Sequence, residues 1–453
     1  MKLPVDPPNL ELLGKELASD PAAFTRLWVN GINPAPDGRY RHWDEIRFRK
    51  PPDGLTREHW WLAIKLARAL ILKPLPLIGN DGRPFQFAMP DPALEMVQSI
   101  DRDASGRIQA SEQVTNPATR DRYLVSSLID EAITSSQLEG AATTYSVAKE
   151  MLRSGRDPRD RNEQMILNNY RAMRHVRDLT DSPLTPEVVL RLQRMLTSET
   201  LDDPSASGRL RTLEEQVKVW DARDGTVLHI PPPSEQLEER LRLMCAFANG
   251  EIPNFYVHPV VRAALLHFWL AYDHPFVDGN GRTARALFYW SMLRSGYWLC
   301  EYLSISGVVK KMPGQYMRAY LYSETDSNDA TYFVLFHLRV VRVAIRELHA
   351  YLERKMTELR GTEQLLRKSH LNHRQLTLIG HALRHPDAEY TIESHRSSHD
   401  VVYQTARADL LDLTSRGLLE KRRLARRFAF FPPGDLSEKV RAQAGRRSRS
   451  LGS

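Results

Sequence analysis

The chain has 453 residues, which predicts two or three domains, and its 42% hydrophobic and 26% charged residues are ordinary for a folded globular protein. Its two cysteines, Cys245 and Cys300, lack the spacing of a zinc site and do not indicate a disulfide framework, which suits a reducing compartment. No apolar run is long enough to span a bilayer, and prolines at positions 4, 7 and 8 interrupt the N-terminus. We therefore expect no membrane helix, no signal peptide and a cytoplasmic location.

The charge is unevenly distributed along the chain. Residues 361–453 hold 17 Lys and Arg against 10 Asp and Glu, a net charge of +7, whereas residues 1–360 hold 46 of each kind. Such asymmetry predicts an anionic partner for the C-terminal region.

Residues 1–110 are expected to form an N-terminal region to which no chemistry can be assigned. Its first 40 residues are rich in proline and show weak periodicity. A helix is predicted from Arg57 to Leu72, with Thr56 as its N-cap. Trp43, Trp60 and Trp61 are expected to pack this region onto the remainder of the protein.

A second helix is predicted over about residues 121–140. Leu124, Leu128, Glu131 and Ser135 have helical spacing, and Gly140 is a good residue to end a helix. Ser135 and Glu139 are four residues apart and share a face. Taken alone, this stretch is typical of a polar helix end closed by glycine.

Helices are expected from Asn162 to Leu179, from Pro186 to Leu201 and from Gln236 to Phe247. Val217–Trp220 and Thr226–Ile230 could pair as two strands around the turn formed by residues 221–225. Taken alone, this pair of strands is typical of an ordinary two-stranded insertion. An apolar helix from Val260 to Tyr272 then leads into the most informative stretch of the chain.

That stretch, His274 to Arg285, is HPFVDGNGRTAR. Gly279 and Gly281 let the backbone approach a ligand closely, and a glycine-rich turn that opens a helix offers free N–H groups to phosphate. Arg282 and Arg285 are three residues apart, on one face of the helix's first turn. Cations at a helix N-terminus oppose its dipole, so their presence favours a bound anion.

These residues resemble the motif of the Fic family, HPFx(D/E)GNGRxxR, and every fixed position is present. The resemblance implies a mainly α fold with a helical core and transfer of AMP from MgATP to a protein Ser, Thr or Tyr hydroxyl. His274 would be the general base and Asp278 the ligand of Mg²⁺. The phosphates would be bound by the loop and helix residues Gly279, Asn280, Gly281, Arg282 and Arg285. Phe276 would pack below the loop and fix it.

Ser135 to Gly140 also resembles a motif of that family, the inhibitory (S/T)xxxE(G/N). The resemblance implies that Glu139 binds Arg285 and competes with the γ-phosphate of ATP.

In the same family, a stretch like Gly208–Arg211 leads into a β-hairpin called the flap, which pairs with the target backbone. An aromatic residue would line the adenine pocket, and we choose Tyr316, with Tyr320 second; the alternative is that either residue only packs in the core. Helices are expected at Tyr302–Ser306 and Gln315–Tyr322.

The C-terminal residues resemble a winged helix-turn-helix domain at 371–432, reached through a connector helix at 346–370. Gln404, Thr405 and Arg407 would enter a DNA major groove, and Arg422, Arg423, Arg426 and Arg427 would contact phosphate. Winged helices also serve as dimerisation or protein-docking modules, so DNA and a homodimer both stay open. Residues 433–453 are expected to be a disordered basic tail.

Together these resemblances imply a Fic domain over residues 111–345, with ATP as substrate and Mg²⁺ as cofactor. Removal of AMP from a modified protein, other nucleotide donors and a nucleotide-sensing DNA-binding regulator remain as alternatives. The sequence names neither the target protein nor the oligomeric state.

Overall fold

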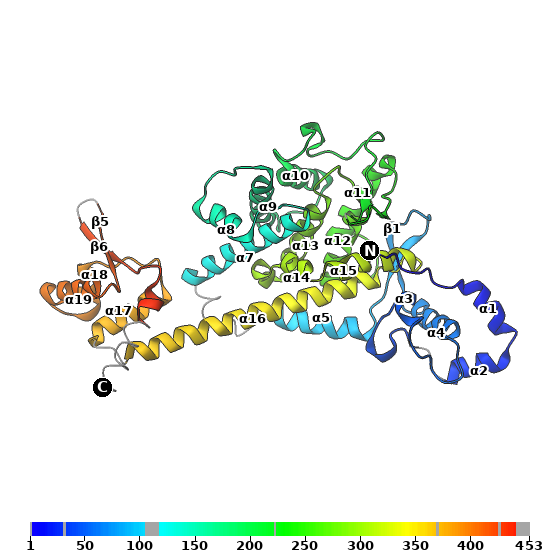
Figure 1. Ribbon diagram of the computed structural model, residues 1–453, viewed down its shortest axis with the longest axis horizontal. Coiled ribbons are helices and arrows are strands. Elements are labelled where there is room, and N and C mark those ends of the chain that lie inside the picture. Colours follow the sequence, from blue (N-terminus) through cyan, green and yellow to red (C-terminus); the bar gives the residue numbers. More distant parts are fainter. Residues whose placement is uncertain are drawn as a thin grey trace. The chain divides into compact units, whose positions relative to one another are not determined.

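The computed structural model describes residues 2–29, 33–104, 117–221, 223–367, 371–424 and 427–440 (Figure 1). The fold is mainly helical, as predicted, and the strands of the described chain form separate two-stranded hairpins. No helix in these residues is long and apolar enough to cross a membrane. The chain divides into two compact units, one holding the described residues of 1–108 and 124–346, the other those of 109–123 and 347–453.

The N-terminal region is more regular than its sequence predicts. It contains α1 (Leu10–Ala18), α2 (Pro21–Val29), α3 (Trp43–Ile46), α4 (Arg57–Ala69), β1 (Lys73–Ile78), β2 (Pro84–Phe87) and α5 (Asp91–Ala104). The predicted N-cap is present, because the Thr56 side chain accepts a hydrogen bond from His59 N at 3.1 Å. Gln86 of β2 bonds to the backbone of Asn328 and Ala330, which joins this region to the start of α16.

Most of the core of the first unit is helical. Its helices include α7 (Pro117–Leu138), which belongs to this unit from Leu124 onward, and α8 (Tyr145–Ser154), α9 (Arg161–Asp178), α10 (Pro186–Thr197), α11 (Leu237–Asn249), α12 (Pro259–Asp273) and α13 (Asn280–Arg294). α12 and α13 lie at the centre, with α9, α10 and α11 packed around them (Figure 1). Both central helices bury almost every side chain, which is expected of a helix that is covered on all sides.

A short hairpin occupies the position of the predicted flap. Its strands, β3 (Val219–Trp220) and β4 (Val227–His229), are shorter than the expected ones but lie inside them. The turn between them is closed by Gly225 N, which donates to Asp221 O at 2.8 Å. Trp220 and Ile230 are exposed at 53% and 58%, so the hairpin presents apolar side chains to solvent.

The predicted helix at Tyr302–Ser306 is wrong. A short 3-10 helix covers Trp298–Tyr302, and Ser304 caps the next helix, α14 (Ile305–Lys311), by accepting from Gly307 N at 3.2 Å. A serine competes for backbone hydrogen bonds inside a helix and is stable at its N-cap, which explains the boundary. α15 (Pro313–Thr325) and α16 (Thr331–Arg367) follow, and α16 is one continuous helix that includes most of the expected connector.

The second unit contains α17 (His373–Arg384), α18 (Ile392–His399), α19 (Tyr403–Ser415), β5 (Glu420–Leu424) and β6 (Arg427–Phe431). The two strands form an antiparallel hairpin, and Tyr390, just before α18, forms a bridge with Phe430 of β6. Leu378, Ile379, Leu410 and Leu413 lie in its buried apolar core.

The prediction of a disordered tail from residue 433 is wrong for its first part. Leu436 and Val440 are 4% and 3% exposed and belong to the core of the second unit. Burial of these two apolar side chains stabilises a segment whose composition alone favoured disorder. The basic residues of the predicted tail, from Arg441 onward, lie outside the described residues.

Candidate active site

His274 ends α12 in the left-handed conformation, with φ of 45°. This turn directs the chain from α12 into the glycine-rich loop. Its Nδ1 lies 3.3 Å from Ala271 O, and because a carbonyl oxygen only accepts, Nδ1 carries the hydrogen. Nε2 is then the unprotonated nitrogen of the neutral ring. Burial lowers the pKa of His274 to about 4, so the ring is neutral near pH 7 and can accept a proton.

The loop after His274 is held in place by Asn280. Its Oδ1 accepts from Phe276 N at 2.9 Å, and its Nδ2 donates to Phe276 O at 2.8 Å. Phe276 is fully buried, as expected for a residue that packs below the loop. The Asn280 side chain therefore braces the loop internally, and a phosphate contact by this residue would use its backbone N–H.

Asp278 and Arg282 are neighbours in the loop. Arg282 Nη2 donates to Asp278 Oδ1 at 3.1 Å, and Arg282 Nη1 donates to Leu196 O at 2.8 Å. The Arg282 side chain is buried, whereas that of Asp278 is 36% exposed. Within the described residues, no hydrogen bond reaches Asp278 Oδ2, so that oxygen is available to a cation. No group of three His, Cys, Asp or Glu side chains in the same residues is arranged to hold a metal ion. Mg²⁺ that also binds phosphate needs only one or two carboxylates.

The N-terminus of α13 starts in the same loop. Gly279 lies at φ of 84°, and a Cβ atom there would come within 2.8 Å of Thr197 Cγ2. At Gly281 a Cβ atom would lie 2.1 Å from Glu139 Oε1. The first N–H groups of a helix have no partner inside it, so the start of α13 is suited to an anion.

Arg285 joins α13 to α7. Its Nε donates to Ser135 Oγ at 2.8 Å, and its Nη2 donates to Ser135 O at 3.0 Å and to Glu139 Oε1 at 2.8 Å. Burial tends to lower the pKa of Arg285, but Glu139, Tyr316 and Glu131 together outweigh it and the pKa is raised. Glu139 itself is 26% exposed, and Gly140 follows it with φ of 95°. The structure thus brings the residues of both sequence motifs into one site.

Tyr316 lies on α15 at the side of this site. Its hydroxyl is 2.9 Å from His267 Nε2 and 3.1 Å from the hydroxyl of Tyr320. Burial raises the pKa of Tyr316, and the positive charge of Arg285 partly offsets that rise. Both tyrosines remain half-buried.

Several residues support the loop through contacts that the sequence does not reveal. Arg211 Nε donates to His274 O at 3.0 Å, Arg211 N donates to Pro275 O at 2.9 Å, and its guanidinium also bonds to Pro232 O. Gln193 Nε2 donates to Asp278 O at 3.0 Å. Arg240 pairs with Asp273, the residue before His274, at 2.6 Å. Most of these contacts reach backbone carbonyls, which no residue pattern reveals.

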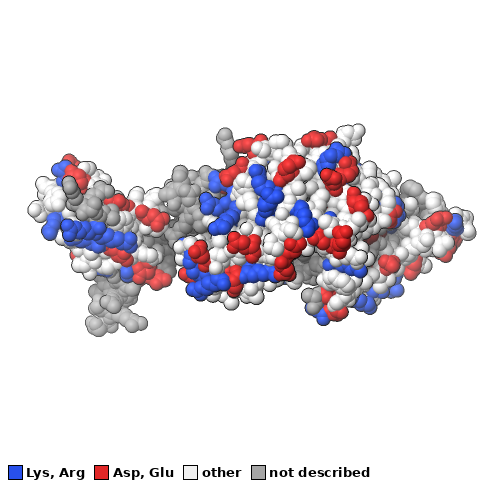
Figure 2. All heavy atoms as spheres, turned by 90° about the horizontal axis from the view of Figure 1, so that it is seen from above, with Lys and Arg blue, Asp and Glu red and all other residues white. Residues whose placement is uncertain are grey.

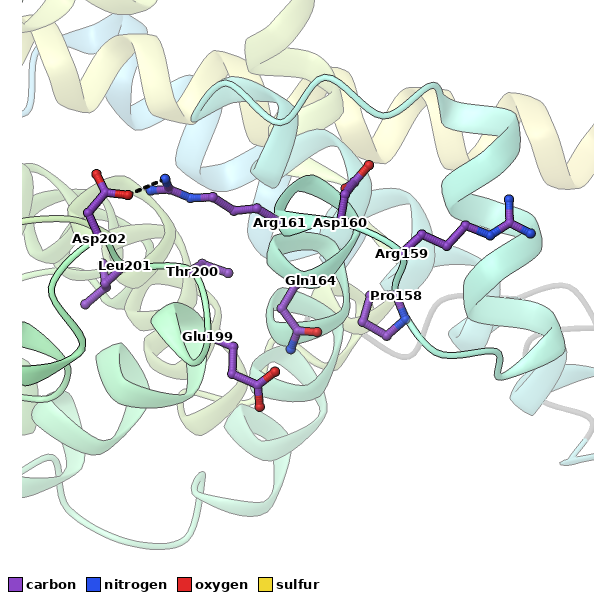
Figure 3. Close-up of a pocket in the computed structure, with 9 residues that line it drawn as sticks. All are labelled: Pro158, Arg159, Asp160, Arg161, Gln164, Glu199, Thr200, Leu201 and Asp202. Atoms are coloured by element: carbon purple, nitrogen blue, oxygen red, sulfur yellow. Dashed lines mark hydrogen bonds and ion pairs between the residues drawn. The ribbon is translucent and has the colours of Figure 1, made fainter.

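A separate shallow cleft of about 290 Å³ opens at the start of α9 (Figure 3). Its lining is polar, and an ion pair between Arg161 and Asp202 at 2.7 Å crosses one edge. The lining consists of Pro158, Arg159, Asp160, Arg161, Gln164, Glu199, Thr200, Leu201 and Asp202. None of the motif residues lines this cleft, so it is not the site formed by His274 and Arg285.

Comparison with known families identifies the central part of the chain. Residues 183–292 match the Fic/DOC family, and this segment contains the whole His274–Arg285 loop. The predicted Fic resemblance is thereby confirmed, and the chain contains a Fic domain. The matched segment does not include Ser135 or Glu139.

The protein adenylyltransferase Fic of Nematostella vectensis is 29% identical over 208 residues, which cover 45% of this chain and 45% of that protein. The protein of the same name from Drosophila melanogaster is 29% identical over 215 residues, or 45% of this chain and 41% of the relative. The chain thus matches less than half the length of these curated relatives. A crystal structure of a Fic family protein from Desulfovibrio desulfuricans G20 covers 76% of this chain and 96% of its own, with a TM-score of 0.51 and 19% identity, which shows likeness of fold.

Proposed function

We propose that this Fic-domain protein transfers AMP from ATP to a hydroxyl group of a protein side chain. The observation that carries the proposal is the state of His274, whose Nδ1 is occupied by Ala271 O and whose pKa is lowered to about 4. A group that only positioned a nucleotide would not need a neutral imidazole with one nitrogen left to accept a proton. The names of the relatives support the same activity.

In the proposed reaction, the target hydroxyl oxygen bonds to the α-phosphorus of ATP. The bond from that phosphorus to the bridging oxygen of pyrophosphate breaks, and pyrophosphate leaves. His274 Nε2 takes the hydroxyl proton. Arg211 and the Asp273–Arg240 pair hold the backbone around His274, so the ring needs little reorganisation during the reaction.

The nucleotide phosphates would lie at the start of α13, where backbone N–H groups and the helix dipole favour negative charge. Arg285, once free of Glu139, would pair with the terminal phosphate. Asp278 would hold Mg²⁺ through its available Oδ2. The ion would neutralise charge on the phosphates and so favour transfer. Tyr316 would flank the adenine.

We further propose that Glu139 inhibits the enzyme. It forms a charge-assisted hydrogen bond with Arg285 at 2.8 Å, and its carboxylate occupies the space next to Gly281 at the start of α13. A terminal phosphate would compete for the same guanidinium and would meet the negative charge of Glu139. ATP that binds beside Glu139 would then be misaligned, and a displacement of about 1 Å can cost roughly 100-fold in rate.

The proposed chemistry is tested by mass spectrometry of the protein after incubation with ATP and Mg²⁺. Glu139→Gly should gain the mass of AMP on a Ser, Thr or Tyr, while Glu139→Gly combined with His274→Ala should gain none and bind ATP with nearly unchanged affinity. Modification that persists within tenfold in the double variant would remove His274 from its proposed role. Replacement of ATP by other nucleoside triphosphates tests the donor, and loss of AMP from a pre-modified target tests the reverse activity.

We propose DNA as a second partner, bound by the second unit through a winged helix-turn-helix arrangement. The support is the order of three helices and a hairpin, with Tyr390 paired to Phe430. Lys and Arg side chains form a band on this unit (Figure 2). Lys421, Arg422 and Arg423 are exposed on β5, and Gln404 and Arg407 are exposed near the start of α19. Arg426 and the side chain of Arg427 lie outside what the structure describes.

Binding of genomic DNA fragments at several salt concentrations tests this partner. Arg422→Ala with Arg423→Ala should weaken binding and lower the slope of log affinity against log salt by roughly 0.9 for each lost phosphate contact. Arg171→Ala with Arg174→Ala, on α9 of the first unit, is the control and should change neither quantity. Equal affinity of all three proteins would exclude the hairpin as a DNA-binding surface.

A further inference from the structure

α7 presents three polar side chains to the core at intervals of four residues: Glu131, Ser135 and, just past the helix end, Glu139. Glu131 and Ser135 are each 1% exposed. Ser135 and Glu139 bind Arg285, so they belong to the site already described. Glu131 is buried one turn further back and bonds to a different part of the protein.

Glu131 binds the start of α14. Its Oε2 accepts from Ser306 N at 3.0 Å and from Ser304 Oγ at 3.1 Å, and its Oε1 accepts from Ser306 Oγ at 2.5 Å. Ser306 N is one of the N–H groups that a helix cannot satisfy by itself. The buried carboxylate therefore completes the cap that Ser304 begins.

Further contacts hold α7 along α14. Thr134 Oγ1 lies 3.3 Å from Ser304 Oγ, and Lys310 Nζ donates to Gln137 Oε1 at 2.5 Å. α14 leads directly into α15, which carries Tyr316. α7 thus contacts both Arg285 and α14, the helix that precedes the one carrying Tyr316.

We propose that Glu131 is a positioning residue. It fixes α7 against α14 in the position from which Glu139 can reach Arg285. This inference rests on the proposed inhibition by Glu139. Any slide or tilt of α7 would leave the Glu131 carboxylate and Ser306 N buried without partners, which is costly. A nucleotide that displaced Glu139 would break only the Arg285 contacts, so α7 would stay docked while inhibition is relieved.

Glu131→Ala removes the hydrogen bonds that anchor α7 to α14, whereas Glu131→Gln can preserve them. The Gln amide oxygen can accept from Ser306 N, and its NH₂ group can donate to Ser306 Oγ. Glu131→Ala should therefore raise transfer from ATP by roughly tenfold over wild type, and Glu131→Gln should stay near wild type. Asp130→Asn is the matched control, because the neighbouring carboxylate accepts from Tyr145 OH of α8 and should not affect transfer.

Combination with Glu139→Gly distinguishes this role from a purely structural one. If Glu131 acts only by aiming Glu139, then Glu131→Ala adds nothing to Glu139→Gly, and the two effects are non-additive. A loss of transfer by Glu131→Ala, both alone and combined with Glu139→Gly, would overturn the inference. The inference would also fail if Glu139→Gly is active while Glu131→Ala alone does not raise the transfer rate above that of wild type. In those cases the proposed AMP transfer still stands.

Hydrogen exchange of the full-length protein provides a readout that is independent of activity. Glu131→Ala should speed exchange in the last turns of α7 and at Ser306, while the exchange of α12 stays unchanged. Ser306→Ala should give a smaller effect in the same direction, which serves if Glu131→Ala fails to fold. If no variant transfers AMP, the proposed function fails, and unchanged protection of α7 in these variants would then overturn the anchor as well.

Discussion

Glu139 Oε1 lies 2.8 Å from Arg285 Nη2 and occupies the space that a Cβ atom on Gly281 would enter. The Glu139 carboxylate thus binds Arg285 on the side of α13 and also covers Gly281 at the start of that helix. Arg285 is only 2% exposed, and its remaining hydrogen bonds go to Ser135. An anion that approaches α13 must therefore displace Glu139 or bind beside it.

Arg285 should contribute more to ATP affinity when Glu139 is absent. In the Glu139→Gly background, Arg285→Ala should weaken ATP binding by roughly 10- to 100-fold, the range expected for a lost charge-assisted hydrogen bond. In the wild-type chain the loss should be smaller, because Glu139 already occupies the guanidinium. Titration calorimetry of the four proteins measures both losses, and equal losses in the two backgrounds would show that Glu139 and phosphate do not compete.

The rate of transfer by Glu139→Gly should be insensitive to mild acid. His274 must be neutral to act as a base, and burial lowers its pKa to about 4. Its rate at saturating ATP should change little from pH 8 to about pH 5 and fall only as the pH approaches about 4. An unshifted histidine has a pKa of about 6.5 and would lose about tenfold by pH 5.5. A decline that begins near pH 7 would contradict the buried, neutral state of the ring.

Arg211→Ala should lower kcat with little effect on the KM for ATP. Arg211 bonds to the carbonyls of His274 and Pro232 and thereby fixes the loop to the base of the flap. Its loss should shift the imidazole and cost roughly 10- to 100-fold in rate. Arg209→Ala is the control, since Arg209 pairs with Glu215 at 2.7 Å and does not contact the loop. Similar kinetics for the two variants would exclude a positioning role for Arg211.

His229 of β4 should anchor the flap in a pH-dependent way. Its Nδ1 lies 2.8 Å from Glu324 Oε2 and its Nε2 lies 2.7 Å from Tyr272 O, so both ring nitrogens face acceptors. Burial tends to lower the pKa of His229, but the hydrogen bond and charge of Glu324, with smaller contributions from Tyr272 O and Asp273, raise it.

Because the folded-state pKa of His229 is raised, its stabilising effect is complete below pH 6.5 and disappears as the pH rises through the folded value. Glu324→Gln should lower the pKa of His229, measured by NMR of labelled histidine. The same substitution should destabilise the protein at pH 6 more than at pH 9. A pKa that does not change in Glu324→Gln would show that the pair is not charged.

The extent to which the site follows from sequence differs from residue to residue. His274 to Arg285 and Ser135 to Gly140 are contiguous motifs, so the sequence predicts both, and the structure brings them together at Arg285. Their detailed roles were less predictable. Asn280 and Arg282 were expected to hold phosphate, yet their side chains are buried and bond to the loop, to Leu196 O and to Asp278.

The contacts of the supporting residues do not follow from the sequence, because they reach backbone groups far away in the chain. Arg211 reaches His274 O and Gln193 reaches Asp278 O, and a carbonyl oxygen leaves no mark on residue type. The sequence indicates Glu131 only as a residue with helical spacing, although it caps α14 from a position 175 residues away in the chain. The polar, charged residues around Leu436 and Val440 favour disorder in the sequence. The structure instead buries these two apolar side chains in the core of the second unit.

The most direct test of the central claim compares wild type with Glu139→Gly for incorporation of label from α-³²P-ATP in the presence of Mg²⁺, including self-labelling. Glu139→Gly combined with His274→Ala is the control for the chemistry, and γ-³²P-ATP is the control for phosphate transfer. We predict strong α-label in Glu139→Gly, weak label in wild type, and none in the double variant or from γ-³²P-ATP. Equal labelling of wild type and Glu139→Gly would contradict inhibition by Glu139, and no α-label in any of them would contradict AMP transfer itself.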